Sequence, residues 1–335
     1  MGHGLSRTMT ATTPAVRRVP RLRHRPSTRA DISECMGLLP AWLALDDTTR
    51  AQLPELWQRL VDEPSVMSSV TEDLAQPAGT RILSWGVGMS LAPGLVAELG
   101  LDAAPEPCVV RHVYRALLDG HHRPMSDREM GQADAAADLR LLAMHFEMKG
   151  TDFNDPLVQS LMVMGAESFR VGFSGYNTRT IYYENSECNE PWVLTSGFLR
   201  RSHAHEAPPT AVPGDRLRFY RVTREEALAT TPGSTVRHIF EHHTPMFRLS
   251  ATQRRLLWLS LFDDNDDALV QRLGVSAHGL KKLWRGIYER IGDVEPEFFG
   301  DTVNDEDGKR GPEKRRQVLA YVRQRPEELR PWAAA

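Results

Sequence analysis

Residues 249–292 read LSATQRRLLWLSLFDDNDDALVQRLGVSAHGLKKLWRGIYERIG, and this stretch decides the architecture of the C-terminal part of the chain. Leucines at helical spacing predict a first helix over 252–262, with Ser250 or Thr252 as its N-cap. The acidic run 263–266 ends that helix and offers caps for the next one. We therefore expect three helices separated by two short turns.

The second helix is expected to reach Leu273, where Gly274 supplies a tight turn and Ser276 caps the third helix. At roughly 100° per residue, the third helix has two distinct faces. Its apolar stripe consists of Leu280, Trp284, Ile287 and Ile291. Its opposite face consists of His278, Lys281, Lys282, Arg285 and Glu289. A helix anchored by one face, with Lys and Arg on the other, can lie in a DNA major groove. The alternative for this face is a solvated surface.

The segment resembles the LuxR-type helix-turn-helix family from end to end. The matching motifs are the opening Leu249-Ser250, the acid-started helix at 267–270, the turn LGVS at 273–276 and the closing IYERIG at 287–292. The resemblance implies a four-helix module that binds DNA and commonly dimerises. On the matching positions, it implies DNA contacts by Ser276, His278, Lys281, Lys282 and Arg285. The chain departs from the family at Gly279, where the family usually carries a side chain on the contacting face.

Length and composition set limits on the rest. The 335 residues suffice for two domains, and the formal net charge of −3 gives no global attraction to nucleic acid. The three cysteines, Cys35, Cys108 and Cys188, have no CxxC spacing, which favours a reducing compartment, and we predict a cytoplasmic protein. No apolar run approaches the roughly 20 residues that span a bilayer, so no membrane span is expected.

The N-terminal residues 1–26 contain six arginines and neither Asp nor Glu. Such a segment cannot bury enough apolar surface to fold alone, so we expect a disordered basic extension. A transit peptide and a minor electrostatic role on DNA are the alternatives. The domain boundaries that we predict are therefore 1–26 for this extension, 27–244 for a sensor domain and 245–335 for the DNA-binding domain with an extra C-terminal helix.

Sequence patterns typical of helices and of strands alternate irregularly in residues 27–244, which predicts an α+β domain. Strands are expected at 81–91, 141–148, 179–184 and 217–222, and helices around 53–61, 110–118 and 157–169. The order of these elements faintly resembles a degenerate GNAT-type acetyltransferase fold. The sequence motif of the acetyl-CoA pyrophosphate loop of that family is absent. The most similar segment, 85–88, lies in a stretch that is expected to be a strand. We therefore transfer no catalytic residue and expect no cofactor. The fold class predicted for the whole chain is α+β followed by an all-α helix-turn-helix domain.

Two other patterns need an interpretation. His238-x-x-Glu241-His242 matches the spacing of a zinc-protease motif, but it lacks a clear third ligand and precedes Thr244-Pro245. We interpret it as a histidine cluster in a linker and expect no metal. The methionines at 144, 148, 162 and 164 are interpreted as core residues, with the lining of a ligand cavity as the alternative.

The sequence therefore predicts a bacterial transcriptional regulator that binds double-stranded DNA as a homodimer. Its N-terminal domain would sense a small-molecule or protein effector. The alternatives are a protein–protein interaction module that uses the helix-turn-helix face, and an acyltransferase-like enzyme.

Overall fold

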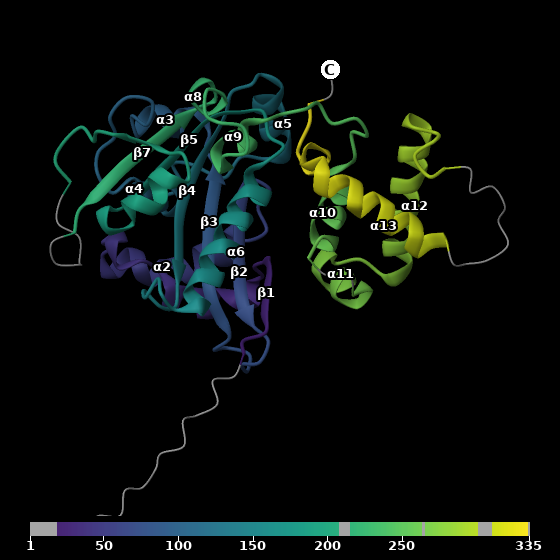
Figure 1. Ribbon diagram of the computed structural model, residues 1–335, viewed down its shortest axis with the longest axis horizontal. Helices are drawn as coiled ribbons and strands as arrows, with labels where there is room; N and C mark the ends of the chain where they lie inside the picture. Colours follow the sequence, from purple (N-terminus) through teal and green to yellow (C-terminus); the bar gives the residue numbers. More distant parts are fainter. Residues whose placement is uncertain (1–18, 208–214, 263–264, 301–309, 334–335) are drawn as a thin grey trace, which may run out of the picture.

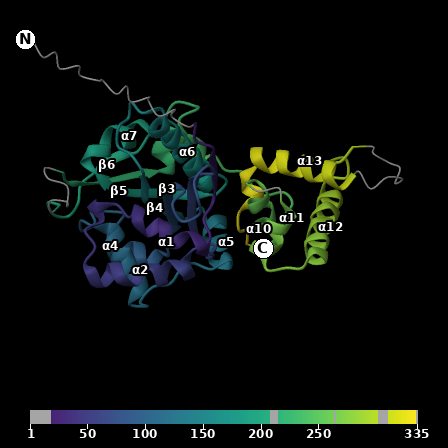
Figure 2. The same ribbon diagram turned by 90° about the horizontal axis from the view of Figure 1, so that it is seen from below.

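The computed structural model describes residues 19–207, 215–262, 265–300 and 310–333. Figures 1 and 2 show a sheet region that is covered by helices, with a separate group of helices beside it. This second group is built from α10 (Ala251–Ser260), α11 (Asp266–Leu273), α12 (Ala277–Val294) and α13 (Arg310–Gln324). A mixed α/β region followed by a helical C-terminal region agrees with the coarse fold class predicted from the sequence.

The sheet has seven strands in the order β1-β2-β3-β4-β5-β7-β6. Their bounds are β1 Leu22–Pro26, β2 Val66–Asp73, β3 Ile82–Ser90, β4 Leu139–Met148, β5 Thr178–Ser186, β6 Leu199–Arg201 and β7 Leu217–Thr223. Neighbouring strands are antiparallel except β4 and β5, which are parallel and joined by the crossover helix α6 (Pro156–Phe173). Pairing of β4 with β5 ends at Ala143 and Tyr183, beyond which the two strands separate.

Helices cover both faces of this sheet. One core packs against the short α1 (Ile32–Cys35), α2 (Asp47–Leu60), α3 (Pro93–Glu98) and α4 (Val109–Leu118). The other packs against α5 (Asp127–Ala135), α6, α7 (Glu190–Thr195), α8 (Arg224–Leu228) and α9 (Thr235–Phe240). Short 3₁₀ turns at Arg29–Asp31, Met36–Leu38, Ala41–Leu43, Glu187–Asn189 and Pro326–Leu329 connect these elements. No helix in the described residues is long and apolar enough to cross a membrane.

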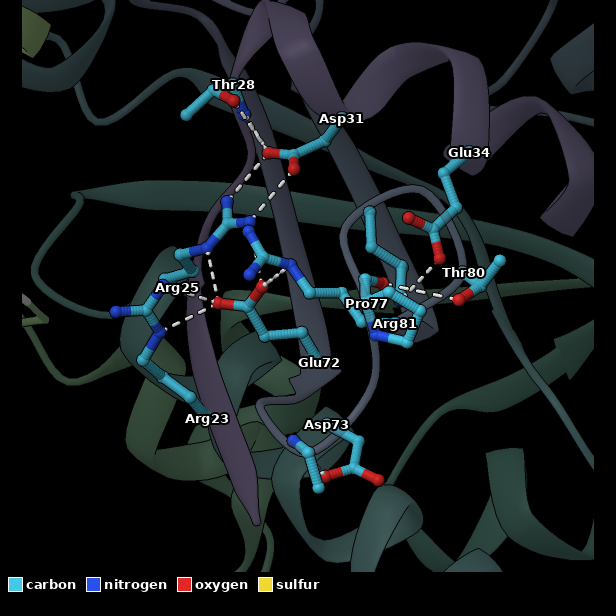
Figure 3. Close-up of polar contacts among 12 residues, drawn as sticks. Arg23, Arg25, Thr28, Asp31, Glu34, Glu72, Asp73, Pro77, Thr80 and Arg81 are labelled. Atoms are coloured by element: carbon cyan, nitrogen blue, oxygen red, sulfur yellow. Dashed lines mark hydrogen bonds and ion pairs between the residues drawn. The ribbon is translucent and has the colours of Figure 1, made fainter. Parts of the chain in front are cut away.

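The edge strand β1 is held by arginines that converge on one buried carboxylate. Glu72 of β2 is fully buried and pairs with Arg23 at 2.6 Å, Arg25 at 2.8 Å and Arg81 at 2.7 Å (Figure 3). Arg25 also forms a two-pronged pair with Asp31, at 2.7 and 2.9 Å. Burial alone would raise the pKa of Glu72, but the hydrogen bonds and charges of Arg25 and Arg23 hold it below its usual value.

This strand corrects one expectation. Residues 22–26 were assigned to an unfolded basic extension, yet they form β1 and pair in register with β2, from Leu22 with Asp73 to Pro26 with Ser69. Their arginines do not need an apolar core, because Glu72 and Asp31 supply buried counter-charges. Residues 1–18, where the rest of that extension was expected, lie outside the described residues.

The two regions are joined by the last described residues of the chain. Arg330, which is 6% exposed, donates to Ser174 O at 2.8 Å and Val171 O at 2.6 Å, at the C-terminal end of α6. Its guanidinium lies 4.5 Å from the ring centre of Tyr176 in the sheet region and 5.4 Å from that of Trp258 in α10. A side chain at Gly175 would meet backbone atoms of 326–327 at 2.4–2.5 Å. The tail therefore lies tightly against the sheet region while it belongs to the helical one.

Candidate nucleic-acid interface

The turn that precedes α12 forms as the sequence predicts. Gly274 ends α11 in the left-handed conformation, with φ 66° and ψ 32°, where a residue without Cβ is favoured. Ser276 then adopts an extended conformation, and its hydroxyl accepts a hydrogen bond from the N–H of Gly279 at 3.0 Å. Three residues, 274–276, thus separate α11 from α12. The N-cap that was expected for α10 is Ser250, whose hydroxyl accepts from the N–H of Gln253.

The predicted phase of α12 is confirmed on its apolar side. Leu280, Trp284, Ile287 and Ile291 are all less than 9% exposed. They belong to a core shared with α10, α11 and α13. Arg315 of α13 covers this side, with its guanidinium 4.8 Å from the ring centre of Trp284 and an ion pair to Asp266 at 2.6 Å. α12 is therefore fixed in orientation by one face and by a neighbouring helix.

The five residues that were singled out for DNA contact, Ser276, His278, Lys281, Lys282 and Arg285, are all exposed. Ser276 is the N-cap of α12, and the other four residues lie on the side of the helix opposite the apolar stripe. We call Lys281, Lys282 and Arg285 the α12 cationic row.

The α12 cationic row differs from nearby arginines in having no protein partner. Within the described ranges, Lys281, Lys282 and Arg285 make neither a hydrogen bond nor an ion pair. By contrast, Arg290 of the same helix donates to Phe247 O at 2.7 Å, and the buried Arg254 of α10 pairs with Asp127 of α5 at 2.5 Å. The row can thus meet an anion without first giving up an internal partner, which keeps the cost of binding low.

Gly279 is compatible with an ordinary helix. It has a helical, negative φ, and a Cβ at this position would lie 3.4 Å from the Ser276 hydroxyl and 3.4 Å from the Val275 Cβ, which are ordinary contacts. The structure therefore does not require glycine here.

The histidine motif does not share one helical face. α9 ends at Phe240, so Glu241 is its C-cap and His242 lies beyond the helix. His238 contacts Arg170 at 2.9 Å and Glu241 at 3.4 Å, whereas His242 contacts Gly175 O at 3.4 Å. No group of three His, Cys, Asp or Glu side chains within the described residues is placed to hold a metal ion.

The N-terminus of the crossover helix α6 is not built to bind a phosphate group. The first turn of α6 has Pro156, which has no N–H, and the Asp155 carboxylate accepts from the N–H of Leu157 at 2.9 Å. The position where a helix N-terminus binds an anion is thus taken by a carboxylate of the chain itself. The glycines at 86 and 88 lie inside β3, as expected, and face aromatic rings: a Cβ at Gly88 would lie 2.0 Å from the Phe173 ring.

The comparisons with known proteins give similarity only in solved structures. No family model matches the chain, and no curated protein matches it. A mutant of SpeG, the spermidine N-acetyltransferase of Vibrio cholerae, is similar over 62% of this chain and 95% of that chain, at 11% identity and a TM-score of 0.35. The dodecameric form of that enzyme covers 62% and 96%, at 11% identity and TM-score 0.33, and its complex with CoA and spermine covers 61% and 96%, at 11% identity and TM-score 0.32.

Neither the acetyltransferase resemblance of residues 27–244 nor the LuxR-type resemblance of residues 249–292 has a match in the family-model and curated comparisons. A similarity of this size does not identify an activity. The function is therefore argued from the residues themselves.

Proposed function

We propose that this chain is a DNA-binding transcriptional regulator in which α12 lies in the major groove. The observation that supports this most directly is the α12 cationic row, which is exposed and unpaired on a helix whose other face is buried. Solvent-exposed Lys and Arg without internal partners can replace the counterions that surround a phosphate backbone. The LuxR-type resemblance of residues 249–292 points to the same function.

Within this proposal, the side chains have different tasks. Lys281 and Lys282 contact phosphates and position the helix, since an ammonium group acts as a point charge. Arg285, with its planar guanidinium, is suited to the two acceptors of a guanine edge. Ser276 and His278 lie near the N-terminus of α12, where the helix dipole adds to the attraction for phosphate.

The sheet region would then sense an effector, and the chain would act as a cytoplasmic homodimer without a cofactor, as the sequence predicts. The two regions are already linked through Arg330, which donates to a carbonyl at the C-terminal end of α6, and through the ion pair of Arg254 in α10 with Asp127 in α5. A change in the sheet region therefore has a physical route to the helical region.

The test is binding of the full chain to random-sequence and genomic DNA fragments across a range of salt concentrations. The double variant Lys281→Ala/Arg285→Ala is expected to bind more weakly, with a log–log salt slope reduced by about one to two units. The matched control is Arg50→Ala/Arg59→Ala, which removes the same charge from exposed positions on α2. An equal loss of slope in both variants would contradict a DNA-facing role for α12.

The first alternative is an acyltransferase. The separation of β4 and β5 beyond Ala143 and Tyr183 favours it, because ligands of open sheets bind where strands diverge. The capped N-terminus of α6 argues against it, since it leaves no anion site for the pyrophosphate of acetyl-CoA. Calorimetric titration with acetyl-CoA decides between the two: saturable binding would favour the enzyme.

The second alternative is a protein-recognition module that uses the same face of α12. It predicts loss of a protein partner, in the absence of any DNA affinity, when Lys281 and Arg285 are replaced. A salt-dependent DNA affinity that the double variant lowers would rule this alternative out.

A further inference from the structure

An internal cavity lies between the sheet and the crossover helix α6. Its floor is formed by β2, β3, β4 and β5, and its sides mainly by α6 and α7. Residues at the deep end, such as Gly88, Ala143 and Val193, are buried, whereas Ala166, Trp192 and Ser196 are half-buried and mark the open end. None of the four methionines considered at first is among the lining residues. Three glycines, Gly86, Gly88 and Gly165, also line the cavity, and the rings of Phe146 and Phe173 lie against them, in the positions that side chains would occupy.

The residues that line the cavity favour an uncharged ligand. Among the described residues that line the cavity there is no Asp, Glu, Lys or Arg. The hydroxyls of Ser69 and Ser168 lie 2.7 Å apart and satisfy each other. Burial lowers the pKa of His145 to about 3, so this lining residue is neutral. A charged ligand would lose its hydration and find no opposite charge.

The size of the cavity selects a narrow ligand. Its volume is about 60 Å³, well below the roughly 150 Å³ of an engineered apolar cavity that takes benzene. A straight aliphatic group fits such a space more easily than an aromatic ring does. The half-buried Trp192, whose ring centre lies 6.0 Å from that of Phe146, leaves an open end through which a polar group can stay near water.

We propose that this cavity is the effector site of the chain and that its ligand is a small uncharged molecule with a straight aliphatic group. The binding of such a ligand is independent of what α12 contacts. Only the control of DNA by this ligand rests on the proposed function.

Helix α6 connects the cavity to the helical region, so its position can depend on whether a ligand is bound. It lines the cavity with Gly165, Ala166 and Phe169, and at its C-terminal end the carbonyls of Val171 and Ser174 accept hydrogen bonds from Arg330. Because packed helices shift as rigid bodies, a displacement of α6 at the cavity reaches the Arg330 guanidinium and, through it, Trp258 of α10.

The test uses the full chain and a series of probes, ethanol, 1-propanol and 1-butanol, titrated by ligand-observed NMR. Each added methylene is expected to tighten binding about fourfold, which corresponds to about 0.8 kcal/mol per buried CH₂. Ala166→Leu from α6 and Ser196→Leu beyond α7 fill the space from two sides and are expected to weaken 1-butanol binding about tenfold or more. The control is Val163→Leu, also on α6 but 70% exposed, which is expected to leave the affinity unchanged. Thermal melting confirms that each variant is folded.

The results separate the two parts of the proposal. Affinities that do not rise with chain length, or that survive both filling substitutions, would overturn the site. Hydrogen exchange of residues 247–260 is expected to change when 1-butanol saturates the wild type, and an unchanged pattern would overturn transmission through α6. Neither measurement involves DNA, so a failure of the proposed function is seen separately, in the DNA titration.

Discussion

The two regions of this molecule use groups of three cationic side chains in opposite ways. In the sheet region, Arg23, Arg25 and Arg81 converge on the buried carboxylate of Glu72. In the helical region, Lys281, Lys282 and Arg285 project from α12 without any partner in the described parts of the chain. The first group surrounds a carboxylate that is closed to solution, whereas the second group is itself open to solution.

This difference teaches how to separate structural from functional charge. A buried cation with a buried partner contributes to the fold, and removing one partner leaves an unpaired charge that costs several kcal/mol. An exposed, unpaired cation contributes little to the fold and keeps its full charge for a binding partner. Composition alone cannot tell these cases apart, because the sequence carries several cationic residues in both places.

The largest effect that this comparison predicts comes from Glu72. We expect Glu72→Gln to lower the free energy of unfolding by about 3–5 kcal/mol, because three guanidinium groups lose their shared counter-charge. Chemical denaturation measures this loss. Glu55→Gln, on an exposed position of α2, is the control and should stay within about 0.5 kcal/mol of wild type. A stability loss of similar size in both variants would contradict the view that buried, paired charges stabilise the fold whereas exposed charges do not.

The second effect concerns the arginine that joins the two regions. Arg330→Ala leaves the carbonyls of Val171 and Ser174 without their buried donor, and we expect a loss of about 3 kcal/mol. Because the tail then holds α6 less firmly, near- and far-ultraviolet circular dichroism are expected to give coincident unfolding curves for wild type and separate curves for the variant. Coincident curves for both proteins would show that the two regions are joined mainly by other contacts.

The helical region could be predicted from the sequence because its signals are local. Gly274, Ser276 and the apolar stripe of α12 lie within a few turns of one another, and each acts on its own neighbours in the chain. The same holds for β3, β4, β5 and β7, whose apolar runs are continuous or alternate clearly. The exposure of the α12 cationic row followed from helical phase alone.

The strands β1 and β2 could not be predicted in the same way. β2 buries Ser68, Ser69 and Thr71 together with Glu72, so no apolar alternation marks it. Glu72 is stable inside the sheet because Arg23 and Arg25, 47–49 residues earlier, pair with it together with Arg81. The cavity beside α6 was missed for a similar reason, since it arises where Gly86, Gly88 and Gly165 from separate elements meet. Such features depend on contacts that are distant in sequence.

The third effect is a pH dependence in the sheet region. Burial, helped by the charge of Arg25, lowers the pKa of His24 to about 4 in the folded state, against about 6.5 when unfolded. Between these values the unfolded chain binds more protons, so stability is complete above the unfolded pKa and falls as the pH drops toward the folded one. We expect this residue to contribute a loss of about 2 kcal/mol between pH 7 and pH 5.

His24→Phe tests this, because it keeps an aromatic ring beside Phe262, whose ring centre lies 5.8 Å from that of His24. Denaturation curves at pH 7 and pH 5 are compared, and the variant should show a smaller loss than wild type. An equal pH dependence in both proteins would assign the effect to other buried groups, such as His145.

The smallest effect separates two glycines that stand five residues apart in the helical region. Gly279→Ala is expected to stabilise the chain by about 0.5–1 kcal/mol, because its backbone is helical and a Cβ makes only ordinary contacts there. Gly274→Ala is expected to destabilise it by about 1 kcal/mol, because φ at this position is 66°. Thermal or chemical denaturation measures both signs. Neither substitution changes a charge, so the salt slope of DNA binding should equal that of wild type in both variants. A reduced slope in Gly279→Ala alone would mean that the methyl group holds the α12 cationic row away from the phosphates, and that α12 meets its partner directly at this turn.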